Sequence, residues 1–421
     1  MTTSSSESDV PFLRALIAAG REGEDACQRL FAERMAALGW DVEVVPYRPE
    51  DVPMVAEFAG TTAIDTGERR SVLARRRGTG GGRSIIFFAH PDGEAHATAK
   101  WRHDPFAGTI AGNRIHGWGV ADDLAGVAAM ADAAALLHET GKTLAGDVVF
   151  ASTPSKRHAR GVSALLHGGL RADACVYLHP AESGSGMREI KALAPGQLTF
   201  RIVVEGRLPD TREPGHTAFA HLAVNPIDKA MLVCAALARL DAERSARIRH
   251  PALDAAVGRS TNLLVSHIDA GVAHRLNRVP AQCTIGAALS FPPPETLEAV
   301  QAEIIAAIDA ACAADPFLSQ HKPRVIWDSG VTGAEVSPEA PLYRTALQVI
   351  TAVTGHAAEV NALHTASDIR NPINQAGIPT IGLGPLCGDL SQNGGHDEWV
   401  DVEDYHRSVQ VVAGIMLAWC G

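Results

Sequence analysis

The feature that most constrains this fold is a series of short apolar runs separated by helical segments. The run S-I-I-F-F-A at Ser84 to Ala89 is apolar almost throughout, as expected of a strand covered on both faces of a sheet. Comparable runs recur at Asp147 to Ala151, Ala174 to Leu178 and Ile378 to Gly384, with helical segments between them. Strands that alternate with helices predict an α/β fold with a mainly parallel sheet.

The pattern changes at Gly196. The order becomes strand, helix, strand, strand, helix, strand, which is the split βαβ order of a ferredoxin-like α+β domain. The segments with this order are Gln197 to Val204, Asn225 to Leu240, Thr261 to Ile268, Gln282 to Phe291, Pro294 to Ala313 and Arg324 to Trp327. We therefore predict a first domain in two parts, 1–195 and 321–421, with a second domain inserted at 196–320.

The composition of the chain narrows the classes of function that we expect for it. The 421 residues include 37 Lys+Arg and 48 Asp+Glu, and a formal charge of -11 without a long basic run disfavours nucleic acid and anionic membranes as partners. No stretch approaches the ~18 apolar residues of a membrane span, and the N-terminus lacks a basic signal region. Seven scattered cysteines without a C-x-x-C motif fit buried thiols in a reducing compartment. We expect a cytoplasmic enzyme that acts on a small anionic substrate.

Three segments carry potential metal ligands. His90 follows the apolar strand, where open α/β sheets place their ligands, and Asp92 could accept its second imidazole N–H. An Asp–His turn pair explains the same spacing. Asp122 and Asp123 precede an apolar helix, which either of them could instead cap. His396 lies in the glycine-rich sequence N-G-G-H-D-E near the C-terminus.

Further motifs occur in a familiar order. They are W-R-H-D-P-F-A-G from Trp101, G-H-T-A-F-A-H-L-A-V-N-P from Gly215, L-N-R-V-P from Leu276, S-D-I-R from Ser367 and G-I-P-T-I-G-L-G-P from Gly377. With them the chain resembles, over nearly its whole length, the acetylornithine deacetylase, succinyl-diaminopimelate desuccinylase and carboxypeptidase G family of metallohydrolases. The resemblance implies a metallohydrolase catalytic domain. It also implies that the inserted domain is a dimerisation lid, giving a homodimer or a higher oligomer.

The resemblance also assigns metal ligands. His90 would bind one metal ion, His396 would bind a second, and Asp122 would bridge the two. Asp92 would be a catalytic residue that supports His90.

Three other residues match substrate-contacting positions of the family. His216 and Asn277 would polarise the substrate carbonyl, with the histidine reaching across the dimer. Arg370 would grip a substrate carboxylate, a bidentate task suited to guanidinium.

The chain departs from the family where its members carry a Glu–Glu pair, the general base and a metal ligand. Spacing from Asp122 puts this pair at Lys156 and Arg157. His179 replaces a carboxylate ligand, which is acceptable because imidazole suits Zn²⁺, Mn²⁺ and Fe²⁺. Glu182 is a possible additional ligand.

This reversal of charge argues against two metal ions. A second divalent ion beside two fixed cations would meet repulsion of the order of several kcal/mol in a partly buried site. We therefore predict one labile ion, Mn²⁺ or Zn²⁺, held by His90, Asp122 and His179. His396 would be a fourth ligand or a substrate contact.

Three functions follow. The leading one is a metal-dependent aminohydrolase of a carboxylated aromatic amine, because Lys156 and Arg157 would hold negative charge that develops on the ring. In this the chain resembles the divergent family member that converts 5-nitroanthranilate to 5-nitrosalicylate and ammonia, with His216 or His158 as the proton donor. The alternatives are an amide or N-acyl amino acid hydrolase, with Glu182 or Glu94 as the base, and a non-catalytic ligand-binding relative.

Overall fold

The predicted apolar runs form the middle of an eight-stranded sheet in the computed structural model, which describes residues 9–60, 63–94, 100–180, 183–362, 367–388 and 397–421. The strands in spatial order are β1 Asp41–Tyr47, β3 Arg69–Arg76, β7 Val148–Ser152, β4 Ile85–Ala89, β8 Ala174–Tyr177, β17 Thr380–Gly382, β9 Glu189–Lys191 and β16 Glu359–Asn361. β7, β4, β8 and β17 run parallel, whereas β1, β3 and β7 pair antiparallel. The α/β class is confirmed, with a mixed sheet.

Helices cover both faces of this sheet, as the unbroken apolar run predicts. Ile85 and Phe87 point into a core shared with α3 and α10, whereas Ile86 and Phe88 face α4 and the residues beside α9. The helices on the first face are α1 Pro11–Ala19, α2 Glu24–Ala37, α3 Ala125–Thr140, α8 Pro341–Thr354 and α10 Val402–Cys420. Those on the second are α4 Gly161–His167 and α9 Arg370–Ala376.

The N-terminal helical segment is divided. A 3-10 turn at Gly20–Glu22 separates α1 from α2, and Gly23 adopts a positive φ of 98°. Gly20 packs against the indole of Trp118, where an added Cβ would lie 2.6 Å from a ring carbon. The close contact at Gly20 leaves no room for a Cβ, and the positive φ at Gly23 is a conformation that favours glycine.

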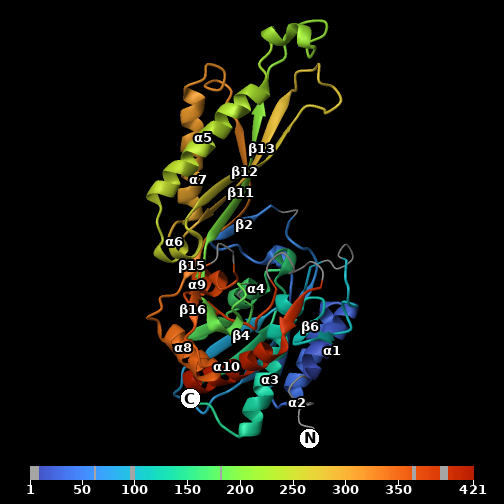
Figure 1. Ribbon diagram of the computed structural model, residues 1–421, viewed down its shortest axis with the longest axis vertical. Helices are drawn as coiled ribbons and strands as arrows, with labels where there is room; N and C mark the ends of the chain where they lie inside the picture. The colour runs from blue at the N-terminus through green and yellow to red at the C-terminus, as the bar shows by residue number, and fades with distance from the viewer. Residues whose placement is uncertain (1–8, 61–62, 95–99, 181–182, 363–366, 389–396) are drawn as a thin grey trace.

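The inserted domain is an antiparallel sheet with α5 Pro226–Arg247 and α7 Leu297–Ala313 packed on one face (Figure 1). Its strands in order are β12 Asn262–Ala270, β13 Gln282–Phe291, β11 Gly196–Glu205, β14 Arg324–Val331 and β2 Glu57–Ala59. A short helix, α6 Pro251–Val257, follows α5. The sheet thus extends past residue 320 and also recruits β2 from the N-terminal part of the chain.

Two smaller sheets complete the described elements. One contains β5 Thr109–Ala111, β6 Arg114–His116 and β18 Trp399–Asp401, and the other pairs β10 Leu193–Ala194 with β15 Ala334–Glu335. The seven cysteines are free, and all but Cys234 are buried. Among the described residues, no helix has the length and apolar character needed to cross a bilayer.

Candidate metal centre

Three potential ligands meet at the carboxyl edge of the central strands. His90 follows β4 directly, and His179 follows β8 by two residues. Because β4 and β8 are parallel neighbours, their carboxyl ends lie side by side. Asp122 projects from the turn Val120–Leu124 that precedes α3, and the ligand atoms of the three residues all lie within 4.8 Å of one another.

The imidazoles are oriented by main-chain carbonyl groups. His90 Nδ1 lies 2.9 Å from the carbonyl oxygen of Asp92, and His179 Nδ1 lies 2.7 Å from that of Pro180. Since a carbonyl oxygen only accepts, each Nδ1 carries the proton and each Nε2 presents a lone pair. Both lone pairs face Asp122 Oδ1, at 2.7 Å from His90 and 2.9 Å from His179.

Three electron-pair donors that face one another require positive charge between them. Burial disfavours charge on these groups, yet the two imidazoles hold the pKa of Asp122 well below its usual range, and Asp122 raises the pKa of His90 well above its usual value. Two imidazole nitrogens and one carboxylate oxygen are ligands suited to a divalent transition metal ion, with a coordination position left open. The donor set therefore fits a single divalent ion.

Asp92 supports His90 and the loop after β7. Its carboxylate accepts the main-chain N–H groups of Ser155 and Lys156 at 3.0 and 2.8 Å, and Arg69 lies 3.3 Å away. Burial would raise the pKa of Asp92, but His90, 3.4 Å away, the Ser155 N–H and Arg69 lower it. The predicted contact with His90 is thus made mainly through the Asp92 carbonyl oxygen.

Asp123 takes the capping role that was open to either aspartate. Its carboxylate lies 3.3 Å from the Gly126 N–H at the start of α3 and 3.4 Å from the His90 N–H. Burial raises the pKa of Asp123 to about 7. The fully buried Asp123 is therefore a structural neighbour of the metal ligands.

Glu398 is a residue that the sequence reasoning missed. Its carboxylate accepts the N–H groups of Gly119, Ala121 and Asp122 at 3.1, 2.8 and 3.0 Å, which fixes the turn that carries Asp122. Burial and the Asp122 carboxylate raise its pKa to about 8. Its signal in the sequence is its place in H-D-E, two residues after His396.

Lys156 does not add the free positive charge that its position in the sequence suggests. Its ammonium binds Asp122 Oδ2 and lies 4.0 Å from Glu94 Oε1. Burial would lower the pKa of Lys156, but Asp122 and Glu94 raise it, so the side chain stays protonated. The charge of Lys156 is not free because Asp122, whose Oδ1 faces His90 and His179, neutralises Lys156 through its Oδ2.

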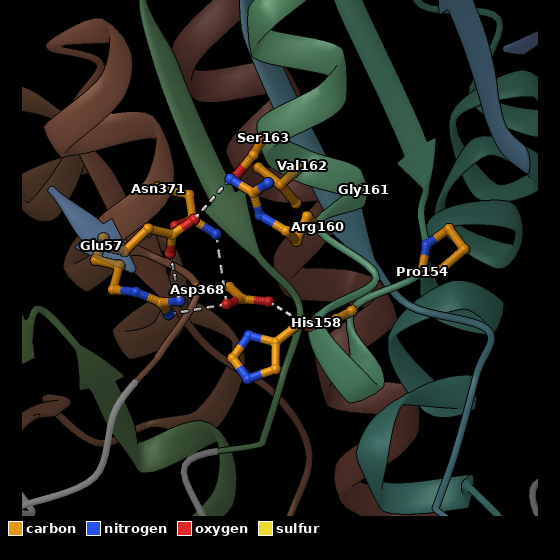
Figure 2. A pocket seen from close by; sticks show the side chains of 11 residues that line it. Glu57, Pro154, His158, Arg160, Gly161, Val162, Ser163, Asp368 and Asn371 are labelled. Atoms are coloured by element: carbon orange, nitrogen blue, oxygen red, sulfur yellow. Dashed lines mark hydrogen bonds and ion pairs between the residues drawn. The ribbon is translucent and has the colours of Figure 1, made fainter. Parts of the chain in front are cut away.

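Arg370 is already paired with carboxylates of the chain. Its Nη1 lies 3.0 Å from Asp368 Oδ1 and its Nη2 lies 3.2 Å from Glu57 Oε2. These groups line a cavity of about 190 Å³, which Figure 2 shows with Glu57, Arg160 and Asp368 at its wall. A substrate contact at Arg370 stays a prediction and would have to compete with these partners.

His216 and Asn277 lie together, but away from the metal ligands of their own chain. The Thr217 N–H donates to the Asn277 carbonyl oxygen at 3.1 Å, and His216 forms a β-bridge with Arg278. These loops occupy the end of the inserted domain furthest from the eight-stranded sheet (Figure 1). One chain therefore does not bring the two parts of the predicted site together.

Three predicted residues fall outside what the structure describes. His396 and Glu182 lie in segments outside the described residues, and the Arg157 side chain is likewise outside them. Their roles stay predictions.

Comparison with known proteins finds similar sequences and similar structures over nearly the whole chain. The succinyl-diaminopimelate desuccinylase of Leptothrix cholodnii is 27% identical over 383 residues, which cover 88% of each chain. A tripeptidase from Staphylococcus aureus aligns over 98% of each chain with a TM-score of 0.71 and 16% identity. A dinuclear metal-binding peptidase from Bacillus subtilis aligns over 97% of this chain and 98% of its own, with a TM-score of 0.62 and 16% identity.

The family match itself covers most of the chain. Residues 87–418 match peptidase family M20/M25/M40, a range that includes all three ligands of the candidate metal centre. The chain belongs to peptidase family M20/M25/M40 and is a metal-dependent hydrolase that acts on C–N bonds.

Proposed function

We propose that the chain hydrolyses the amide bond of an N-acyl amino acid or a short peptide, with one divalent ion held by His90, Asp122 and His179. The observation that carries this proposal is the convergence of these three ligands on one point. Relatives named as a desuccinylase and a tripeptidase support an amide substrate. When bound, such an ion polarises a carbonyl group and lowers the pKa of water.

The position of Lys156 favours one bound metal ion over two. Its ammonium binds Asp122 Oδ2, the carboxylate oxygen that a bridging ligand would offer to a second ion. A second divalent ion there would have to displace a partly buried, charge-compensated ammonium. The Lys156 ammonium thus supplies positive charge where a second metal ion would supply it, but it cannot coordinate ligands as a metal ion does.

We assign the proton acceptor to Glu94. A base is needed because the family glutamate is replaced by Lys156, whose raised pKa keeps it protonated. Glu94 Oε1 lies 4.0 Å from Lys156 Nζ, and its side chain is 48% exposed, so water reaches it. The Trp118 indole N–H fixes the Glu94 main chain by donating to its carbonyl oxygen at 2.7 Å.

We also propose a homodimer through the inserted domain, in which His216 and Asn277 of each copy serve the metal centre of the other. β12 is an edge strand of the inserted sheet and exposes Leu264 and Ile268, which are 61% and 51% exposed. Unpaired backbone groups and apolar side chains on one edge favour pairing with a second copy. This arrangement would supply the carbonyl-polarising residues that one chain keeps at a distance.

The aromatic aminohydrolase reaction has weaker support. Its physical basis was a surplus of positive charge from Lys156 and Arg157, and Asp122 neutralises Lys156. The relatives named above are a desuccinylase and peptidases. We therefore prefer the amide substrate.

The test is a substrate comparison with purified protein, with added Mn²⁺ or Zn²⁺ and with chelator. N-succinyl and N-acetyl amino acids, dipeptides and 5-nitroanthranilate are incubated separately, and free amine, carboxylic acid and ammonia are measured. We expect metal-dependent release of an amine and a carboxylic acid. Ammonia from 5-nitroanthranilate alone would overturn the amide proposal in favour of the aromatic one, and no turnover with metal-loaded protein would favour a binding role.

A further inference from the structure

We infer that Arg160 and Arg370 form a carboxylate-binding site that Glu57 occupies from within the chain, and that a ligand carboxylate displaces Glu57. The inference rests on the proposed function only in treating that ligand as the substrate. No motif in the sequence points to Glu57 or Arg160. The site follows from contacts between segments far apart in the chain.

Glu57 is shared between the two arginines. Its Oε1 lies 3.3 Å from Arg160 Nη2, both residues being labelled in Figure 2. Its Oε2 lies 3.2 Å from Arg370 Nη2. All three side chains are largely buried, with 5% of Arg160, 11% of Glu57 and 15% of Arg370 exposed. Arg160 is held in place because it also donates to the carbonyl oxygens of Pro49, Val52 and Pro53.

Arg370 is left with an unused donor on the same edge. Its Nε is buried and has no hydrogen-bond partner among the described residues. In a guanidinium group, Nε and Nη2 share the edge that binds a carboxylate with two parallel bonds. Glu57 reaches only Nη2, because its other oxygen is held by Arg160. A ligand carboxylate that bound both nitrogens would satisfy the donor that Glu57 leaves unpaired.

The balance of charges means that a ligand carboxylate must compete with Glu57 for the two arginines. Arg160 and Arg370 carry two positive charges, and Glu57 and Asp368 carry two negative ones. A further carboxylate beside them would leave an uncompensated negative charge in a largely buried site unless Glu57 moved away. The adjoining cavity of about 190 Å³ has room for a carboxylate group.

The displacement would reach both the inserted domain and the metal centre. Glu57 begins β2, which pairs with β14 of the inserted sheet, so its ion pairs tie that sheet to α9 and to the residue before α4. On the other side, Ser155 Oγ donates to Asp368, and the Ser155 N–H donates to Asp92 beside His90. Binding of a ligand carboxylate would thus break the ion pairs by which Glu57 connects the inserted sheet to the first domain. The contacts that lead from Asp368 through Ser155 and Asp92 to His90 would stay in place.

Succinate, a small dicarboxylate, is the probe, and its dissociation constant is measured by calorimetry on the full-length protein as purified. The variants are Glu57→Gln, Glu57→Gln combined with Arg370→Met, and the control Glu68→Gln, which changes an exposed glutamate. We expect Glu57→Gln to bind succinate about 5–10 times more tightly, because charge-assisted pairing of Arg370 is freed. The double variant should lose this gain, and the control should match the unmodified protein.

A second measurement follows β2 directly. Hydrogen exchange of the amides at Glu57–Ala59 should become faster when succinate saturates the unmodified protein, and should be fast in Glu57→Gln without succinate. Equal affinity of Glu57→Gln and the unmodified protein, absence of succinate binding in both, or unchanged exchange would each overturn the inference. Because turnover is not measured, these outcomes leave the amide hydrolase proposal to its own test.

Discussion

The metal centre and the far end of the inserted domain contain residues assigned to one site, yet they differ in burial. His90 and Asp122 are 2% and 8% exposed, and each is held by contacts with other elements. At the other end, Leu276 beside Asn277 is 90% exposed. Ligands fixed by their own domain form a site within one chain. In the proposed dimer, the exposed polar residues of the inserted domain would meet their partners only by association, so we expect the two regions to fail in different ways when changed.

The largest expected effect is at Asp122. Asp122→Asn keeps the shape but removes the charge that binds both the ion and Lys156, so we expect loss of bound metal and a fall in amide turnover of at least about 1,000-fold. Metal content is measured by mass spectrometry alongside turnover. Asp104→Asn, at an exposed aspartate paired with Arg21, is the control. Unchanged metal content in Asp122→Asn would mean that the ligand set is wrong.

The second prediction concerns His216. His216→Ala should lower turnover about 100-fold, the usual effect of removing one group that stabilises an oxyanion, while metal content stays unchanged. When the variant is co-expressed with Asp122→Asn, about a quarter of the normal activity should return, because half of the dimers are mixed and each has one intact site. His221→Ala, on the same turn, is the control. Failure to recover activity in the mixture would rule out a site shared between copies.

The third prediction weakens the association itself. Leu264→Lys places a charge on the edge strand β12, and we expect the dimer dissociation constant to rise at least about tenfold. Sedimentation velocity measures it. Val44→Lys is the control because β1 is also an edge strand and Val44 is 51% exposed, but on the other sheet. Equal effects of both changes would place the contact elsewhere.

The smallest expected change is in metal stoichiometry. Lys156→Glu replaces the ammonium on Asp122 with a carboxylate, so bound metal should rise from about one to about two ions per chain. Equilibrium dialysis with Mn²⁺ followed by elemental analysis measures this ratio. The exposed Lys142→Glu should keep one ion. If Lys156→Glu also keeps one, then Lys156 is not what limits the site to a single ion.

Local patterns in the sequence predicted much of this molecule. The position of His90 after an apolar strand marked it as a potential ligand at the sheet edge, the family resemblance assigned it that role, and the structure brings Asp122 and His179 to it. The order of elements also predicted the inserted domain's strands and helices closely. The interruption between α1 and α2 falls at the 3-10 turn before Gly23, beside Gly20, which packs against Trp118 from a distant segment.

Charge assignments were less predictable than positions. Lys156 and Arg370 were expected to offer free positive charge, but Asp122 neutralises the first, and Glu57 and Asp368 neutralise the second. A sequence gives the sign of a side chain, whereas its net effect depends on partners up to 313 residues away. The same is true of Glu398, which supports Asp122 across 276 residues.

The sequence by itself determined the α/β class and the family, and through the family resemblance it predicted three candidate metal ligands, because strand periodicity and motif order lie in neighbouring residues. Tertiary structure decided which charges remain free, that β2 joins the inserted sheet, and that His216 and Asn277 stand apart from their own metal centre. These features depend on contacts between segments distant in the chain, and burial at those contacts sets the strength of each charge.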